Sequence, residues 1–308
     1  MISYLNAQAQ QFLTAVETVQ QQINTATEQV SSGLKVQFAS DQPDVVSELL
    51  QLHTNLELNN QITNNLSAAT TDNTVAQSAL TQANSLLQTA VGIAAQGATS
   101  TATAATRQEL AGQVQAILQQ MVSLANTQSG EVYVFGGDAA TSPPYQYDLS
   151  SGNGVDQLTS AAATQQVQNP QGGSFPVSQT AQQIFDDRNA DGTYASDNIF
   201  ATLTNLYNGL MNNDQTAVEN ATTALQLSSN HLNEALAFYG TVQNQLQNAS
   251  SFAASYNTQL QTQIGQLQDA DVAAASLELS EGTTQLQAAF EAESRIPQTT
   301  LFNYLTNG

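Results

Sequence analysis

Apolar side chains recur at alternating intervals of three and four positions along the N-terminal stretch of the chain. The series consists of Ile2, Leu5, Ala9, Phe12, Val16, Val19, Ile23, Ala26 and Val30. This alternation places all of these side chains along one seam of a helix, which is the pattern of a coiled coil. The core helix of an ordinary bundle is the alternative, but the length and regularity of the seam favour a long helix with helical partners.

Two further helices are expected before the middle of the chain. Ser31-Ser32-Gly33 interrupts the first seam, and the turn residues that follow offer Ser40 or Asp41 as a candidate cap ahead of Pro43. The apolar alternation then resumes and predicts a helix from about residue 45 to 95. After a break rich in small residues, a third helix is expected along the stripe Leu110, Val114, Ile117, Met121 and Leu124.

The middle of the chain has a different character. The residues of 131–135 alternate, favour β-structure and lead into Gly136-Gly137, which predicts a strand followed by a turn. Residues 138–195 contain four of the six prolines, together with many Gly, Ser and Asn. This segment has too many helix breakers for long helices and is too long for a simple loop, so it predicts a small inserted domain of strands and turns.

Helical patterns return in the C-terminal half. Apolar residues from Ile199 to Leu225 indicate helical structure, and a seam that starts at Leu232 continues, with one slip, through Leu267. A last helix carries the stripe Val272, Leu279, Leu286 and Phe290, and an apolar cluster closes the chain. The two halves mirror each other around the insertion, which predicts that the two chain ends lie together.

These patterns predict a mainly α protein, in which both chain ends form a long antiparallel helical coiled-coil rod and a small β-containing outer domain is inserted. The expected division has three parts. They are a terminal coiled-coil assembly domain (1–40 and 270–308), a helical rod domain (41–137 and 196–269) and the inserted outer domain (138–195).

Composition narrows the range of functions. The chain of 308 residues is 41% hydrophobic and only 9% charged, with a formal net charge of -21. Because of this charge, and because the polar helix faces lack Lys and Arg, neither nucleic-acid binding nor membrane insertion is expected. The absence of cysteine excludes disulfides and cysteine-based metal sites. The N-terminus lacks the features of a secretory signal, so if the protein leaves the cell, its export is expected to proceed without a cleaved signal peptide.

One segment has the residue order of a metal-binding loop. Asp187, Asn189 and Asp191 precede Gly192 in the pattern D-x-N-x-D-G, which places oxygen ligands for calcium on alternate residues. The twelfth position is Asn198 instead of the usual Glu. A plain turn of Asp, Asn and Gly is therefore favoured, with calcium as the alternative and no other cofactor expected.

Catalysis is not expected from this sequence. His53 and His231 fall within helical runs without a phosphate loop or nucleophile motif, which favours solvated helix histidines. The acidic group at residues 186, 187, 191 and 197 is more typical of solvated loop carboxylates than of the acids of a secreted hydrolase. The chain is therefore expected not to be an enzyme.

Short motifs near both ends are more specific than the helical seams. They are Val30-Ser31-Ser32-Gly33-Leu34-Lys35-Val36, Asp269-Ala270-Asp271, Leu279-Ser280, Gln285-Leu286-Gln287-Ala288 and Ile296-Pro297-Gln298. These motifs resemble the flagellin and hook-filament junction family of bacterial flagellar proteins. Ser40-Asp41-Gln42-Pro43, Tyr133-Val134-Phe135-Gly136-Gly137 and the ending at 301–305 are similar to the junction branch, which is favoured over filament flagellin. Gln42 departs from that branch, which usually has an acid there.

The resemblance implies an extracellular structural subunit of the bacterial flagellum that joins hook to filament by helical self-assembly. The alternative is flagellin, and more distant alternatives are a surface adhesin or a calcium-binding secreted protein. The implied partners are other copies of the chain, neighbouring hook, junction or filament subunits, and a cytoplasmic export chaperone at the C-terminal helix. The ends are expected to be disordered in the isolated subunit and to bury their apolar faces on assembly. The side chains assigned to this interface are Ile2, Leu5, Phe12, Val16, Val19, Ile23, Val30, Val272, Leu279, Leu286, Phe290, Leu301, Phe302 and Leu305.

Overall fold

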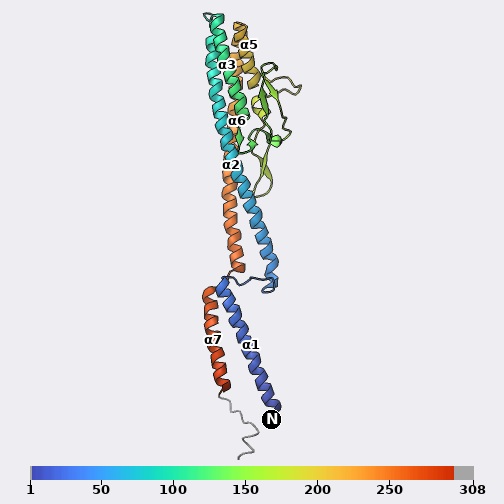
Figure 1. The fold of residues 1–308 in the computed structure, drawn as a ribbon, viewed down its shortest axis with the longest axis vertical. Helices are drawn as coiled ribbons and strands as arrows, with labels where there is room; N and C mark the ends of the chain where they lie inside the picture. Colours follow the sequence, from blue (N-terminus) through green and yellow to red (C-terminus); the bar gives the residue numbers. More distant parts are fainter. Residues whose placement is uncertain (1, 295–308) are drawn as a thin grey trace, which may run out of the picture. The chain divides into compact units, whose positions relative to one another are not determined.

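The structure is a computed structural model that describes residues 2–294, with side chains described from residue 9 onward. The chain divides into two compact units, one of residues 1–57 and 257–308 and the other of residues 58–256. Two long helices, α2 (Pro43–Gly97) and α6 (Gln215–Gln268), contribute residues to both units (Figure 1).

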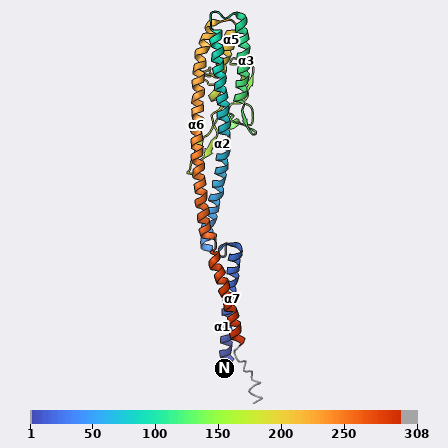
Figure 2. The ribbon, with the colours of Figure 1, turned by 90° about the vertical axis from the view of Figure 1, so that its left-hand side faces the viewer.

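The first unit contains two helices from opposite parts of the chain. These helices, α1 (Ile2–Ser32) and α7 (Val272–Ser294), lie side by side and run in opposite directions (Figures 1 and 2). A small core in the same unit is formed by the buried Val36, Leu49 and Ile264. The predicted pairing of a helix from each end is therefore confirmed.

The second unit contains the main hydrophobic core. Residues 58–97 of α2 and 215–256 of α6 run antiparallel, and α3 (Ala104–Ala125) packs against α5 (Ile199–Met211) beside them (Figures 1 and 2). Many core side chains come from the predicted three-and-four stripes, and they include Leu80, Leu87, Val114, Met121 and Leu232, all of which are buried. Helical periodicity therefore identifies the inward faces of these helices correctly.

Side-chain amides connect α2 to α6 along the length of the second unit. The hydrogen-bonded pairs are Asn59 with the Ala253 carbonyl, Asn73 with Gln243, Gln77 with the Tyr239 carbonyl, and Asn84 with Asn233. As the residue number rises along α2, it falls along α6, so the bonds define one antiparallel register. Asn59 and Asn73 are buried, and a buried amide in a helical seam specifies register at some cost in stability. Amides thus perform here the pairing that charged residues often perform in coiled coils.

The inserted region consists of short hairpins and turns. The antiparallel strand pairs are β1 (Gln128–Ser129) with β2 (Val132–Tyr133), β3 (Tyr145–Tyr147) with β4 (Val155–Gln157), and β5 (Gln166–Gln168) with β6 (Ser174–Pro176). A 3-10 turn, η1 (Gly137–Ala139), and a short helix, α4 (Ala181–Phe185), complete the region. The predicted strand-and-turn insertion is confirmed, although each of its strands is only two or three residues long.

The strand expected over 131–135 is shorter than predicted. Only Val132–Tyr133 is extended, because Phe135 is buried in an aromatic cluster and the backbone turns to place it there. The Phe135 ring centroid lies 5.6 Å from that of Phe185 and 6.2 Å from that of Tyr239. The Gly136 N–H donates to the Tyr133 carbonyl over 2.9 Å, which closes the turn. The cluster docks the inserted region against α6.

A buried arginine, Arg107, caps the C-terminal end of α2. Arg107 is only 5% exposed, and its Nε donates to the Gly97 carbonyl over 2.8 Å. Its two Nη atoms donate to the Thr99 carbonyl and to Asn213 Oδ1 over 3.1 and 2.5 Å. Carbonyls at the end of a helix lack partners within the helix and favour a positive charge. Arg107 therefore satisfies the end of α2 and connects it to α3 and to the turn that follows α5.

The predicted fold class is confirmed as mainly α, with long antiparallel helices and a small strand-containing insertion. The boundaries between the two units fall within the long helices, between residues 57 and 58 of α2 and between residues 256 and 257 of α6. The finer three-part division into assembly, rod and outer domains stays a prediction. Across residues 2–294, none of the helices combines the length and apolar character that crossing a lipid bilayer requires.

Candidate functional site: the paired terminal helices

Small residues on α7 allow α1 and α7 to approach closely. Ala275 and Gly282 are the buried residues of α7, and they are spaced one heptad apart. A Cβ atom at Gly282 would lie 2.8 Å from Ile23 Cγ1, so the two helices could not keep this separation with a larger residue. The rings of Phe12 and Phe290 meet edge-on, with centroids 6.4 Å apart. Neither Ala275 nor Gly282 was predicted, because the stripe was defined by large apolar side chains.

A backbone bridge joins the segments where α1 ends and α7 begins. Gly33 adopts a φ of 73°, in the left-handed region that glycine favours, and accepts a hydrogen bond of 2.8 Å from the Ala270 N–H. The Lys35 N–H donates to the Gln268 carbonyl over 2.8 Å, and Lys35 Nζ donates to the Gln266 carbonyl over 3.0 Å. The motifs at 30–36 and 269–271, which carried the sequence resemblance, thus face each other in one bridge.

Asp41 holds the loop between this bridge and α2. Its Oδ2 accepts hydrogen bonds from the Phe38 N–H over 2.8 Å and from the Gln37 N–H over 2.9 Å. These backbone bonds, led by that of Phe38, hold the pKa of the Asp41 carboxyl below its ordinary value of 3.8. The expected helix cap at this position is therefore a loop clamp, whose carboxylate reaches back along the chain.

We expect this clamp to open in acid. Because the pKa of Asp41 is lower in the folded loop than in the unfolded chain, its contribution to loop stability is complete above pH 3.8 and is lost as the pH falls through the folded value. In an NMR titration, the Gln37 and Phe38 amide signals should shift together with a midpoint below 3.8. Asp41→Asn should remove that transition, whereas a midpoint at or above the ordinary value would contradict the clamp.

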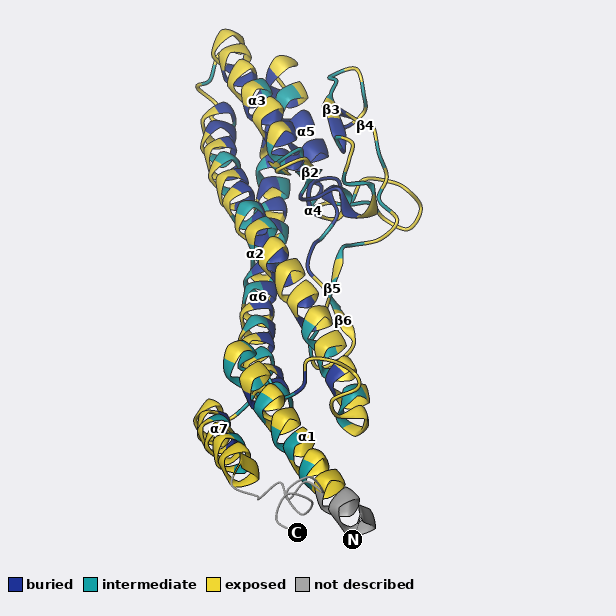
Figure 3. Cartoon of the chain, turned by 60° about the horizontal axis from the view of Figure 1, so that its bottom comes forward, coloured by how far each residue is buried: buried dark blue, intermediate teal, exposed yellow. Residues whose placement is uncertain are grey.

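The helix pair leaves large apolar side chains uncovered. Leu13 and Leu277 are each 61% exposed, and Phe290 is 54% exposed. Figure 3 shows that exposed positions dominate both α1 and α7, whereas buried positions recur along α6 and along α2 from residue 59 onward. Two helices alone cannot cover such stripes, and exposed apolar surface of this kind marks an interaction site. The pair thus has the properties of an unfinished helical core.

The structure brings the predicted interface residues of α1 and α7 into one helix pair. Phe12, Val16, Val19, Ile23, Val30, Leu279 and Leu286 are half-buried, whereas Val272 and Phe290 are exposed. Ile2 and Leu5 belong to α1, and Leu301, Phe302 and Leu305 lie outside the described residues. The assembly role of all these side chains stays a prediction.

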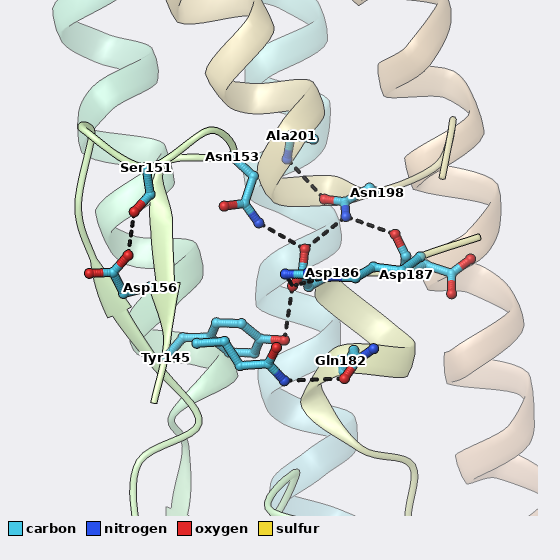
Figure 4. A network of polar contacts seen from close by, with 11 residues as sticks. Tyr145, Ser151, Asn153, Asp156, Gln182, Asp186, Asp187, Asn198 and Ala201 are labelled. Carbon is cyan, nitrogen blue, oxygen red and sulfur yellow. Dashed lines mark hydrogen bonds and ion pairs between the residues drawn. The ribbon is translucent and has the colours of Figure 1, made fainter. Parts of the chain in front are cut away.

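A second polar site lies within the inserted region, around the fully buried Asp186 (Figure 4). Its Oδ1 accepts from Asn153 Nδ2 and Asn198 Nδ2, each over 2.8 Å. Its Oδ2 accepts from Arg188 Nη2 over 2.7 Å and from the Tyr145 hydroxyl over 3.3 Å. The prediction of a solvated carboxylate is wrong for Asp186, because separate segments converge on it. Burial and then the negative charge of Asp186 raise the pKa of Tyr145 above its ordinary value of 10.0, which keeps the hydroxyl protonated.

The segment that resembles a calcium loop forms a tight turn. Asp191 Oδ1 accepts from both the N–H and the hydroxyl of Thr193, over 3.0 and 2.6 Å. Asn189 Nδ2 donates to Thr193 Oγ1 over 2.9 Å, and Asn198 Oδ1 caps α5 at the Ala201 N–H. In the part of the chain that the structure describes, no three acidic or histidine residues gather as a metal site would require. Calcium binding by Asp187, Asn189 and Asp191, which was the weaker alternative to a plain turn, stays untested, and calorimetry with an Asp187→Ala control would check it.

The two histidines differ in their surroundings. His53 is exposed, as predicted for a solvated helix residue. His231 is not, because its Nε2 lies 2.8 Å from the Gln183 carbonyl and its Nδ1 lies 3.3 Å from Asp197 Oδ2. It therefore connects α6 to the segments on either side of Asp186, which is a positioning role within the fold.

Paired helices from both chain halves, with an open apolar surface and an inserted region, are typical of a class of helical structural subunits. Two family models, the bacterial flagellin N-terminal and C-terminal helical regions, match residues 2–138 and 216–305. The chain belongs to the bacterial flagellin family and is a structural component of the bacterial flagellum.

Individual proteins that the chain is similar to include hook-associated and junction proteins of the flagellum. It is 26% identical over 296 residues to flagellar hook-associated protein 3 of Escherichia coli strain K12, with 89% of this chain and 90% of that protein covered. The solved structure of flagellar hook associated protein-3 from Legionella pneumophila matches with a TM-score of 0.59 and 17% identity, covering 72% of this chain and 98% of that chain. A structure of the flagellar junction protein FlgL from Legionella pneumophila matches with a TM-score of 0.51 and 17% identity, covering 66% and 99%. At these identities the two structures support the fold.

Proposed function

We propose that this chain is a subunit of the junction between the flagellar hook and the filament, and that it joins them by helical self-assembly through α1 and α7. The observation that carries the proposal is the helix pair with its uncovered Leu13, Leu277 and Phe290. The similarity to hook-associated protein 3, at 26% identity in an alignment that covers 89% of this chain, supports a position at the junction over that of a filament subunit.

Burial of the open stripe supplies the driving force for this assembly. Complete transfer of a Leu or Phe side chain from water stabilises a protein by about 1.5–3 kcal/mol. Several such side chains per subunit offset the cost of ordering and immobilising the subunits. Helices with matching stripes on other copies, and on adjacent hook and filament subunits, are the partners that fit this surface. The weak charge of the helices leaves apolar contact as the main attraction.

The position of the protein along the flagellum tests the proposal. A functional, epitope-tagged chain should be found by immunogold electron microscopy at one narrow zone where the hook meets the filament. Deletion of the gene should leave hooks intact and without filaments. Label along the whole filament would overturn the junction proposal in favour of flagellin, while the structural role of the family would remain.

We infer that the exposed C-terminal helix is covered by a cytoplasmic chaperone before export. Support comes from the exposed Phe290 and the half-buried Leu286, whose apolar surface would otherwise promote aggregation in the cell. Changing Leu286, Phe290, Leu301 and Phe302 to Ser should abolish binding of the chaperone in a pull-down with purified components. Leu158→Ser, at an exposed position of the inserted region, should leave binding unchanged. Equal binding by both variants would reject the inference.

We further propose that the chain is exported without a cleaved signal peptide and performs no catalysis. Export through a narrow channel requires an unfolded chain, and the absence of cysteine removes disulfides as an obstacle to threading. Mass spectrometry of the assembled protein should therefore find the native N-terminal segment, including Ile2. Loss of that segment would contradict this export route.

A further inference from the structure

A pocket in the second unit lies between the β5–β6 hairpin and the outer face of α6. Its volume is about 260 Å³. Asn169, Gln171 and Phe175 of the hairpin segment form one wall, and Gln245, Asn248 and Phe252 of α6 form the other. The buried Ala249 lies between the two walls. All of the lining residues are uncharged, although the chain carries a formal net charge of -21.

The hairpin wall is held in place before any ligand arrives. The Asn169 N–H donates to the Gly173 carbonyl over 3.0 Å, and the Gln171 N–H donates to Asn169 Oδ1 over 3.1 Å. Phe175 pairs across the strands with Val167, and both side chains pack on the core formed by Ala249 and its neighbours. This arrangement fixes the Phe175 ring and the Asn169 amide, so little ordering is needed on binding.

The α6 wall presents one aromatic ring and two amides on one helix face, and Tyr256 lies one turn beyond these lining residues. Gln245, Asn248, Phe252 and Tyr256 follow the helical spacing of three and four. The Phe252 and Tyr256 rings are nearly parallel, with an interplanar angle of 19° and centroids 6.2 Å apart. Phe252 is 37% exposed. Within residues 2–294, the side-chain amides of Gln171, Gln245 and Asn248 form no hydrogen bond, so they are available to a ligand.

We propose that this pocket binds a neutral saccharide. A pyranose ring has apolar C–H faces that pack on flat aromatic rings, and hydroxyl groups that both donate and accept hydrogen bonds. Side-chain amides are neutral and also both donate and accept hydrogen bonds, and the pocket combines them with the Phe175 and Phe252 rings. Charged ligands find no counter-ion among the lining residues, and a purely apolar ligand would leave the amides desolvated without partners.

The pocket requires two parts of the chain that are far apart in sequence. The hairpin belongs to the inserted region, whereas the second wall belongs to α6. The excised segment 138–195 therefore lacks half of the site, and the intact chain is the correct material for a binding experiment. The site is also independent of α1 and α7, so saccharide binding goes beyond the proposed assembly function.

Saturation-transfer NMR and calorimetry with the intact chain test the proposal. The neutral probes are cellotetraose, mannotetraose and N,N′,N″,N‴-tetraacetylchitotetraose, with 3′-sialyllactose as the anionic comparison. At least one neutral probe should bind saturably, with a Kd of roughly 0.1–1 mM because the pocket is open to solvent. In a second arm of the experiment, the neutral tetrasaccharide that binds is linked to a serine peptide. Tighter binding of this glycopeptide than of the free tetrasaccharide would identify a protein-borne glycan as the natural ligand.

Variants on α6 separate the pocket from other surfaces. Phe252→Ala and Gln245→Ala should each weaken binding by about tenfold, whereas Gln247→Ala, at an exposed position on the same helix, should leave it unchanged. Circular dichroism and the unfolding temperature confirm that the variants are folded. Absence of saturable binding by every neutral probe, stronger binding of 3′-sialyllactose, or wild-type affinity in both pocket variants would each overturn the proposal.

Discussion

A Gly282→Leu variant is expected to be exported normally and to leave hooks without filaments. The reason is the position of Gly282 in α7, where even a Cβ atom would lie 2.8 Å from Ile23 Cγ1. Leucine would force α1 and α7 apart, at a cost of about 1–3 kcal/mol for the overpacked substitution. Intrinsic helix propensity acts in the opposite direction, because Leu is favoured over Gly in a helix by about 0.8 kcal/mol. A loss of assembly would therefore identify packing between the helices as the cause.

Electron microscopy of cells, with a count of hooks that carry filaments, measures this effect. Gly92→Leu is the matched control, because Gly92 lies within α2 with no atom near the position of a Cβ. That control should gain helix propensity and assemble normally. Gly282→Ala combined with Ile23→Ala should assemble better than Gly282→Ala alone, since the second change restores the space. A normal number of filaments in Gly282→Leu would show that the pairing seen here is not the pairing used in assembly.

The long helices could be predicted because their signal is local. The helix expected from about residue 45 to 95 is observed as Pro43–Gly97, and the expected third helix as Ala104–Ala125. Each apolar stripe lies within a single continuous element, so the spacing of its side chains is sufficient to define both the element and its buried face. The antiparallel return of the chain followed from the similar patterns in the two halves.

The polar sites could not be predicted in this way, because their partners are distant in sequence. Tyr145 is 41 positions from Asp186, and Gln183 is 48 positions from His231. In the sequence, Asp186 is followed by Asp187 and Arg188, which is typical of a solvated loop. Its burial arises only when β3, the loop that contains Asn153 and the start of α5 meet around it. The register between α2 and α6 depends in the same way on amide pairs that no single stripe reveals.

The same distinction explains which part of the assembly surface was missed. The large apolar residues of α1 and α7 were visible as stripes, and the structure brings several of them into the helix pair. Ala275 and Gly282 contribute by being small, and their importance depends on how closely α1 approaches. Their heptad spacing was present in the sequence, so a search for small residues at heptad intervals would have found them.

Asp186→Asn is expected to lower the free energy of unfolding by about 3 kcal/mol. The variant keeps the shape of the side chain but removes its charge and replaces one acceptor oxygen with an amide donor. Asp186 Oδ1 accepts from two amides and Oδ2 from Arg188 and Tyr145, so either orientation of the new amide turns donors toward donors. Arg188 would then retain its charge beside a neutral group, in a site where the other partner is fully buried.

Urea unfolding followed by the near-ultraviolet signal of tyrosine should detect the change, because Tyr145 lies at the centre of the affected region (Figure 4). Asp187→Asn is the matched control, since its half-buried side chain forms no hydrogen bond within the described residues. That control should change the free energy of unfolding by less than about 0.5 kcal/mol. Loss of the Asp186 charge should also lower the pKa of Tyr145 in the variant. That pKa should still lie above the ordinary value of 10.0, because burial is the larger cause of the shift. Equal unfolding midpoints for the two variants would show that the buried carboxylate of Asp186 contributes no more to the fold than the half-buried carboxylate of Asp187.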